Sequence, residues 1–135
     1  MYNAMQQQPA AFAEIARRVQ TQAEQVASSE LARAERIFLV GTGTSFHAAQ
    51  IGYYLLRNTS TATHAPHIQA CPAFDFALYG PTSLSARDCV IVISHRGAKR
   101  YSLDAIKQAR EANSYTLLIT GQGEPASSQY AHCIF

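Results

Sequence analysis

The sequence predicts an α/β domain built from parallel β-α-β units. Short apolar runs of strand length alternate along the chain with segments whose apolar residues recur at helical spacing, and this alternation favours a parallel sheet with right-handed crossovers. The length of 135 residues suits one domain. A hydrophobic content of 47% is enough for a packed core.

The first 35 residues are expected to form an N-terminal helical segment. They are rich in Ala, Gln, Glu and Arg, and their apolar positions fall at helical spacing. These positions are Phe12, Ile15, Val19, Ala23 and Val26. Pro9 suits a first helical turn, because its missing N–H needs no partner there. Ser28 or Ser29 is expected to cap a second helix.

The first half of the domain is predicted as strand 36–41, helix 44–58, strand 67–71 and a short helix within 73–80. The apolar run at 36–41 ends in glycine, as a strand buried on both faces does. The following helix has a wide apolar stripe, so we expect it to be largely buried. The residues that widen the stripe are Ile51, Tyr54 and Leu55.

The second half continues the alternation to the last residue. The expected elements are strands at 88–95, 115–121 and 132–135 and helices at 102–112 and 125–131. Ser102 is expected to cap the helix that it begins. The final strand starts just as the sequence stops, so we expect the domain to be truncated at its last strand.

Composition excludes several classes of protein. A net charge of +2 is too mild for a general nucleic-acid binder, and a charged content of 15% is low for a free-standing surface. The low content of charged residues favours association with another copy or another domain. A small soluble domain with weakly charged faces is the alternative. We expect a homodimer or a higher homo-oligomer.

The cysteines and the apolar runs point to a reducing compartment. Cys71, Cys89 and Cys133 are odd in number and widely spaced, which is typical of buried free thiols and not of a metal site or a disulfide framework. No apolar run approaches the roughly 20 residues that span a membrane, and the N-terminus lacks the pattern of a signal peptide. We therefore expect a cytoplasmic protein with no metal, no cofactor and no membrane contact.

Two strand-to-helix turns carry the residues suited to a ligand. "GTGTS" (41–45) brings hydroxyls to the start of a helix, where free N–H groups favour an anion. "SHRGAK" (94–99) combines a serine, a flexible glycine and two cations. Ligands of open parallel sheets bind at the carboxyl ends of the strands, so both turns lie where a site is expected.

Other functions for these turns are less favoured. The first turn has two glycines of a dinucleotide-binding fingerprint, but Phe46 stands in the third place and no acid follows to hold a ribose. A P-loop is excluded, because no glycine-lysine-hydroxyl triplet follows Gly41. Simple helix capping by Thr and Ser stays an alternative to an anion site.

The two turns resemble those of the SIS (sugar isomerase) domain family, and in particular the first isomerase lobe of glucosamine-6-phosphate synthase. The family's Gly-Thr-Ser-aromatic-His-Ala turn matches Gly43 to Ala48, and its Ser-Glu-Phe matches Phe74 to Phe76. Its Ser-Gln-Ser-Gly-Glu-Thr turn matches Ser94 to Lys99, where only the serine and Gly97 are kept. The match runs in the right order over nearly the whole chain.

This resemblance implies a fold, a ligand and a set of binding residues. The fold is a flavodoxin-like parallel sheet of five strands with helices on both faces, over residues 36–135. The ligand is a sugar phosphate of the hexose or hexosamine 6-phosphate class. The expected binding residues are Gly43, Thr44, Ser45, Ser94, His95, Arg96, Gly97 and Lys99. Arg96 and Lys99 stand where the family has neutral residues, and both suit a phosphate, although outward, solvated side chains are the alternative.

The catalytic residues stay unknown at this point. Aldose–ketose isomerisation needs a base of tuned pKa, and among nine acids only Asp75 is expected to approach the pocket, more as a hydrogen-bond acceptor than as a catalyst. His95 is expected at the pocket as a phosphate donor, and His47 as a partly buried side chain. By the resemblance, the base and ring-opening residues belong to a second lobe and a tail.

Three functions follow from these observations. The chain is the N-terminal lobe of an aldose–ketose or amino-sugar phosphate isomerase or deaminase, or it is a non-catalytic module that senses phosphosugars. The third and weakest is a nucleotide or nucleic-acid binder that uses Arg96, Lys99 and Arg100.

Overall fold

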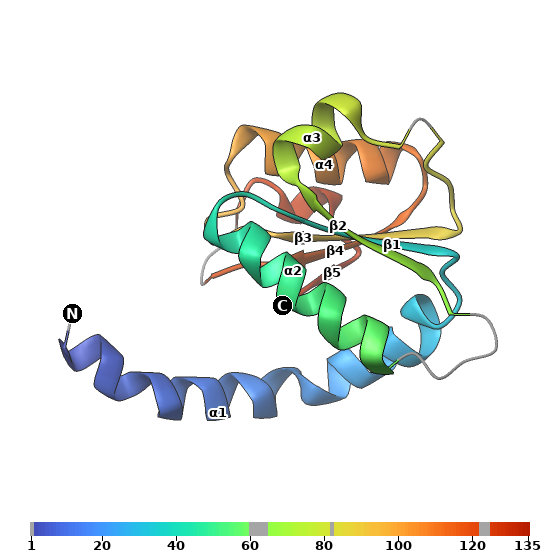
Figure 1. Ribbon diagram of the computed structural model, residues 1–135. Coiled ribbons are helices and arrows are strands. Elements are labelled where there is room, and N and C mark those ends of the chain that lie inside the picture. Colours follow the sequence, from blue (N-terminus) through green and yellow to red (C-terminus); the bar gives the residue numbers. More distant parts are fainter. Residues whose placement is uncertain (1, 60–64, 82, 122–124) are drawn as a thin grey trace. The chain divides into compact units, whose positions relative to one another are not determined.

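The computed structural model describes residues 2–59, 65–81, 83–121 and 125–135, and the chain divides into two compact units. The first unit is Met1–Ala32 and the second is Arg33–Phe135. The first contains helix α1 (Tyr2–Val26) and a π-helical turn, η1 (Ala27–Leu31). The second contains every strand of the described chain (Figure 1).

The N-terminal helix is longer than predicted and continues without a capped break. Pro9 lies inside α1 and not in its first turn, because the helix already begins at Tyr2. The hydroxyls of Ser28 and Ser29 donate backwards to the carbonyl oxygen of Gln25, at 3.1 and 2.8 Å. The prediction that one of them caps a second helix was therefore wrong. Back-bonding of this kind favours a local widening of a helix, as seen in η1.

The second unit is a five-stranded parallel sheet with the strand order β2-β1-β3-β4-β5, which confirms the predicted fold class. Its strands are β1 (Arg36–Gly41), β2 (His67–Pro72), β3 (Asp88–Ile93), β4 (Tyr115–Ile119) and β5 (Cys133–Ile134). Its helices are α2 (Thr44–Thr59), α3 (Ala73–Tyr79), α4 (Arg100–Glu111) and the 3₁₀ turn η2 (Ser128–Tyr130). Helix α2 covers one face of the sheet, and α3 and α4 cover the other (Figure 1).

The main core lies between the sheet and helices α3 and α4. It includes Phe38 and Val40 of β1, Val90 and Val92 of β3, and Ile106 of α4, all buried. The rings of Phe38 and Phe76 meet edge to face at 5.5 Å. Burying a side chain of this size contributes about 1.5–3 kcal/mol, so this cluster holds α3 and α4 against the strands that lead into the two turns.

Helix α2 is less buried than its apolar stripe predicted. Ile51, Tyr54 and Leu55 are each more than 60% exposed, whereas Ala49 is fully buried. The reason is a close approach to the sheet at small residues, since a Cβ on Gly52 would lie 2.7 Å from a side-chain carbon of Leu39. The larger side chains are left on the outer face of the helix.

Several predicted boundaries moved by one to three residues. The strand predicted at 88–95 ends at Ile93, the strand at 115–121 ends at Ile119, and the last strand is only Cys133–Ile134. The helix predicted at 102–112 begins two residues earlier, at Arg100, so Ser102 is not its cap. The short helix predicted at 125–131 is the single 3₁₀ turn η2. The three cysteines are buried and free, as predicted.

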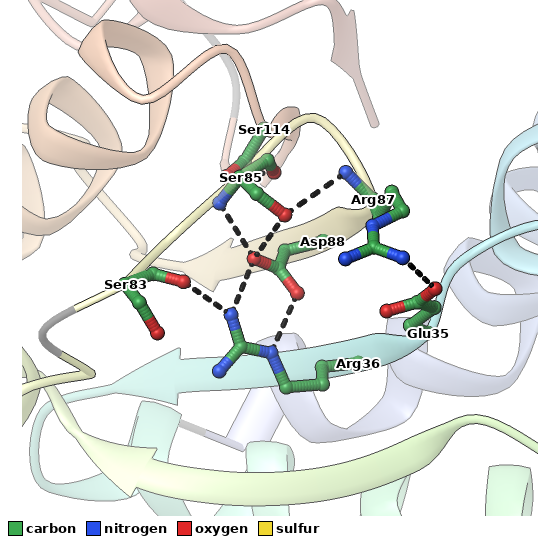
Figure 2. A network of polar contacts seen from close by, with 7 residues as sticks. All are labelled: Glu35, Arg36, Ser83, Ser85, Arg87, Asp88 and Ser114. Atoms are coloured by element: carbon green, nitrogen blue, oxygen red, sulfur yellow. Dashed lines mark hydrogen bonds and ion pairs between the residues drawn. The ribbon is translucent and has the colours of Figure 1, made fainter.

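A polar network joins the amino ends of β1 and β3 (Figure 2), and the two turns lie at the opposite, carboxyl ends of these strands. Arg36 donates from Nε and Nη2 to the two carboxylate oxygens of Asp88, at 2.7 and 2.6 Å. The backbone N–H and the hydroxyl of Ser85 also donate to Asp88, and Ser114 donates to the Ser85 carbonyl at 2.8 Å. Asp88 is thus a fully partnered buried carboxylate.

The network sets the charge state of Asp88. Burial alone would raise the pKa of this carboxyl group, but the hydrogen bonds from Arg36 and Ser85 and the charge of Arg36 outweigh burial and lower its pKa. The same hydrogen bond to Asp88 raises the pKa of Arg36. Both groups are therefore charged at neutral pH.

Candidate functional site

Two turns leave neighbouring strands at the same level of the sheet. Gly41, the last residue of β1, is paired in register with Ile93, the last residue of β3. From β1 the chain runs outward through α2 to β2, and from β3 it runs the other way through α4 to β4. The strand order therefore reverses between β1 and β3, which is where open parallel sheets bind ligands.

A cavity of about 450 Å³ lies between these turns. The first turn supplies Thr42, Thr44 and Ser45, and Ile93 ends β3 below them. The rest of the lining comes from the second turn and from the first turn of α4, namely Ser94, His95, Arg96, Ala98, Lys99 and Ser102. Five of the ten lining residues carry a hydroxyl group.

Glycines with positive φ shape both turns. Gly43 has φ +60° and Gly97 has φ +57°, a region that other residues rarely adopt. Gly97 is restricted in a second way, because a Cβ at this position would lie 2.3 Å from the Cβ of Pro125 and 2.5 Å from the Oγ of Ser127. The second turn is thus packed tightly against the segment that precedes β5.

Backbone hydrogen bonds also hold the second turn in place. Ser94 N–H donates to the Ile119 carbonyl at 2.9 Å, and Gly97 N–H donates to the Ser94 carbonyl at 3.1 Å. The carbonyl of His95 accepts from Gly121 N–H at 3.0 Å and from the Thr120 hydroxyl at 3.3 Å. The end of β4 therefore braces the turn that follows β3, which keeps its shape fixed when no ligand is bound.

Two hydroxyl groups at the cavity lack a hydrogen-bond partner among the described residues. They are the Oγ1 of Thr42 and the Oγ of Ser102, and both atoms are buried. Ser102 as a whole is 1% exposed. A buried hydroxyl without a partner costs about 1–3 kcal/mol, so such groups in a native fold call for an explanation. An oxygen-rich ligand in the cavity would supply the missing partners.

The electrostatic character of the cavity is positive. Its lining includes the cations of Arg96 and Lys99 and no acidic residue. Helices α2 and α4 begin beside it, at Thr44 and Arg100, and the N–H groups of a first helical turn have no acceptor within the helix. The arrangement is suited to an anion that carries several oxygens.

The structure brings together six of the eight predicted binding residues. Thr44, Ser45, Ser94, His95, Arg96 and Lys99 line the cavity. Gly43 and Gly97 do not line it and instead set the course of the turns. Sequence reasoning missed Ser102, because a serine at a helix start was interpreted as a cap. It noted the hydroxyl of Thr42 but did not include that residue among the binding residues.

The candidate acid Asp75 and His47 do not line this cavity. Asp75 lines a different cavity of about 470 Å³, together with Cys71 and the aromatic rings of α3, so the prediction that it approaches the site was wrong. Burial, with a smaller contribution from the Asp75 carboxylate, raises the pKa of the Cys71 thiol to about 11, so this thiol is protonated at neutral pH. His47 is exposed on α2, not partly buried as predicted, and His64 lies outside the described residues.

Among the residues that the structure describes, no three His, Cys, Asp or Glu side chains are close enough to hold a metal ion. Within the same residues, no helix is both long and apolar enough to cross a membrane.

Comparison with known families gives one match, to the SIS domain, over residues 30–135. Among curated proteins, the glutamine–fructose-6-phosphate aminotransferase [isomerizing] of Caldanaerobacter subterraneus subsp. tengcongensis is 27% identical over 95 residues. That alignment covers 70% of this chain but only 15% of the relative.

Solved structures with the same fold include two proteins whose descriptions name an amino-sugar phosphate. Glucosamine-6-phosphate deaminase of Thermotoga maritima superposes with a TM-score of 0.66 at 18% identity, over 82% of this chain and 35% of that one. The Vibrio vulnificus NanR protein, complexed with ManNAc-6P, superposes with a TM-score of 0.66 at 14% identity, over 85% of this chain and 41% of that one. At these identities the likeness concerns the fold, and this chain spans less than half of each protein.

Proposed function

The chain belongs to the SIS domain family, and we propose that it binds a sugar phosphate of the hexose or hexosamine 6-phosphate class in the cavity between its two turns. The observation that carries the proposal is the lining of this cavity, which has five hydroxyl-bearing residues, two cations and no acid. Hydroxyls and helix N-termini are suited to a phosphate and to sugar hydroxyls. The relatives named for glucosamine 6-phosphate, fructose 6-phosphate and ManNAc-6P support this class of ligand.

In this proposal the two turns divide the work of binding. Ser45 and Ser94 donate to the phosphate, together with N–H groups at the start of α4. Thr44, His95, Arg96 and Lys99 surround the sugar phosphate, while Gly43 and Gly97 keep both turns in the required shape. The pocket needs no cofactor or metal to bind such a ligand.

Thermal unfolding of the chain in the presence of candidate ligands tests this proposal. Glucosamine 6-phosphate and fructose 6-phosphate are each titrated, with glucosamine and fructose as controls that lack the phosphate. A ligand at about 100 times its dissociation constant stabilises a protein by about 2.7 kcal/mol. We expect stabilisation by at least one phosphate and by neither free sugar. If no hexose phosphate raises the unfolding temperature, the proposed ligand class is wrong.

The biological role is one of two that share this binding step. The chain is proposed as the N-terminal lobe of an aldose–ketose or amino-sugar phosphate isomerase or deaminase, with its base supplied from beyond this domain. The alternative is a non-catalytic phosphosugar sensor, and the lack of any acid in the lining favours it for the chain taken alone. Incubation of fructose 6-phosphate in heavy water with the intact protein that contains this domain separates the two, because an isomerase exchanges a carbon-bound hydrogen with solvent and a sensor does not.

Assembly and location complete the proposal. Exposed apolar side chains on α2, including Ile51, Tyr54 and Leu55, support association into a homodimer or a higher homo-oligomer. Light scattering on the purified chain measures this, and a monomer at micromolar concentration would contradict it. We further propose a cytoplasmic protein, consistent with three free cysteines, which fractionation of cells tests.

A further inference from the structure

The cavity has an interior of hydroxyl groups and a rim of cations. Ser94 and Ser102 are buried, and Thr42 and Ser45 are partly buried. Arg96 and Lys99 line the same cavity but are exposed. A ligand that enters the cavity therefore meets hydroxyls and helix N-termini at its inner end and positive charge at its outer end.

The rim cations are not neutralised by the protein. Neither Arg96 nor Lys99 forms an ion pair with any residue that the structure describes, and no acid lines the cavity. On the adjoining helix α4, by contrast, Arg100 and Lys107 each face an acid four residues later, Asp104 at 3.8 Å and Glu111 at 3.9 Å. The two cations at the mouth of the cavity are therefore available to an anionic group of a ligand.

The interior can hold a phosphate without these cations. The hydroxyls of the lining and the N–H groups at the start of α4 offer neutral donors in sufficient number for one phosphate. Arg96 and Lys99 are then available to a different group of the ligand. A guanidinium matches a carboxylate or a phosphate with two parallel hydrogen bonds, and an ammonium adds a point charge.

We propose, building on the phosphosugar-binding function above, that the ligand of this site is a phosphosugar with a second anionic group, a carboxylate or a second phosphate, which Arg96 and Lys99 hold at the rim. The first phosphate occupies the hydroxyl-lined interior. The second anionic group is what distinguishes this ligand from a simple hexose 6-phosphate.

Matched pairs of ligands test the inference. Sorbitol 6-phosphate and 6-phosphogluconate differ only at C1, which is a hydroxymethyl group in one and a carboxylate in the other. Glucose 6-phosphate and glucose 1,6-bisphosphate form the corresponding pair for a second phosphate. Dissociation constants for the full chain are measured by calorimetry at low salt. We expect the two-anion member of at least one pair to bind about 10-fold tighter, as one charged hydrogen-bonded contact provides, and the pair that shows the preference identifies the second group.

Two double variants assign the effect to residues. Arg96→Gln with Lys99→Gln removes the rim charge, and Arg57→Gln with Lys107→Gln removes the same charge from helix surfaces that do not line the cavity. We expect the first variant to lose the preference, so that its affinity for the two-anion ligand falls about 10-fold further than its affinity for the one-phosphate ligand. The control variant should keep the preference.

Each other outcome contradicts the inference in a recognisable way. Equal affinity of the unaltered chain for both members of both pairs would show that the ligand needs no second anionic group, and it would leave the proposed function intact. An equal loss for one-anion and two-anion ligands in the rim variant means that the cations hold the interior phosphate. A preference that survives in the rim variant removes Arg96 and Lys99 from this role. Failure of every phosphate to bind overturns the proposed function as well.

Discussion

At the scale of single residues, the site includes groups that lower the stability of the fold when no ligand is bound. Gly97 adopts a positive φ and is packed against Pro125 and Ser127, so only a glycine fits there. Ser102 buries a hydroxyl for which the described residues provide no partner. Costs of this kind concentrate at functional sites, where a ligand compensates for them. The sequence indicated a flexible glycine in this turn, and the positive φ of Gly97 agrees with that, but its role in binding stays a prediction. Ser102 is a common residue at a helix start and carried no such signal.

Replacement of Ser102 by alanine separates a binding role from a structural one. Because the variant no longer buries an unpaired hydroxyl, we expect the ligand-free chain to unfold at an equal or higher temperature than the original. Affinity for the sugar phosphate should fall about 10-fold, the equivalent of one hydrogen bond of about 1.4 kcal/mol.

Ser85→Ala is the matched control for this experiment. Ser85 donates to Asp88 far from the cavity, so its loss should lower the free energy of unfolding by about 1 kcal/mol and leave ligand affinity unchanged. If Ser102→Ala behaved in the same way as Ser85→Ala, the Ser102 hydroxyl would be a structural group and not a ligand contact.

At the scale of elements, the site is an outcome of how β1 and β3 are aligned. Their carboxyl ends carry the two turns, and their amino ends are joined through Arg36 and Asp88 (Figure 2). These two residues are 52 positions apart in the sequence, so no local pattern could pair them, and sequence reasoning placed Asp88 only as a residue before a strand.

The burial of α2 was overestimated for a similar reason. Periodicity shows which residues share a face, but the close contact at Gly52 decides which face meets the sheet.

The Arg36–Asp88 pair makes part of the stability of the fold dependent on pH. The pKa of Asp88 is lower in the folded chain than its ordinary value, so its contribution is complete above the unfolded pKa of about 3.9 and is lost as the pH falls through the lower, folded pKa. Asp88→Asn leaves Arg36 without its partner, and we expect it to lower the free energy of unfolding at pH 7 by about 2–4 kcal/mol.

Denaturant unfolding at a series of pH values between 7 and 2 measures this effect. The difference between the original chain and Asp88→Asn should be constant near neutral pH and should shrink below about pH 4. Glu35→Gln is the control, since Glu35 is an exposed partner of Arg87 and should cost less than about 1 kcal/mol. A difference that stays constant down to pH 2 would show that the charge of Asp88 is not the source of its contribution.

At the scale of the whole molecule, the sequence was enough to predict the fold but not the boundary between the N-terminal helical segment and the domain. The alternation of strands and helices and the two turn motifs were enough to predict the parallel sheet, because parallel strands need helical crossovers and glycine-rich exits. The boundary between a helical segment at 1–35 and a domain at 36–135 stays a prediction. Two strand ends were placed two residues too late, because the predicted strands included the residues that follow each apolar run, Ser94 and His95 after Ile93 and Thr120 and Gly121 after Ile119, whereas strand pairing ends at Ile93 and Ile119.

We propose that one sugar phosphate binds between the turns after β1 and β3. Backbone amide resonances of the chain, recorded during titration with glucosamine 6-phosphate, test this proposal because they report both binding and its location. We expect the largest saturable shifts on Thr44, Ser45 and the turn from Ser94 to Lys99, and we expect that inorganic sulfate at the same concentration does not reproduce them. Saturable shifts centred on Asp75 and Tyr79 at the second cavity, or no shifts at all, would contradict it.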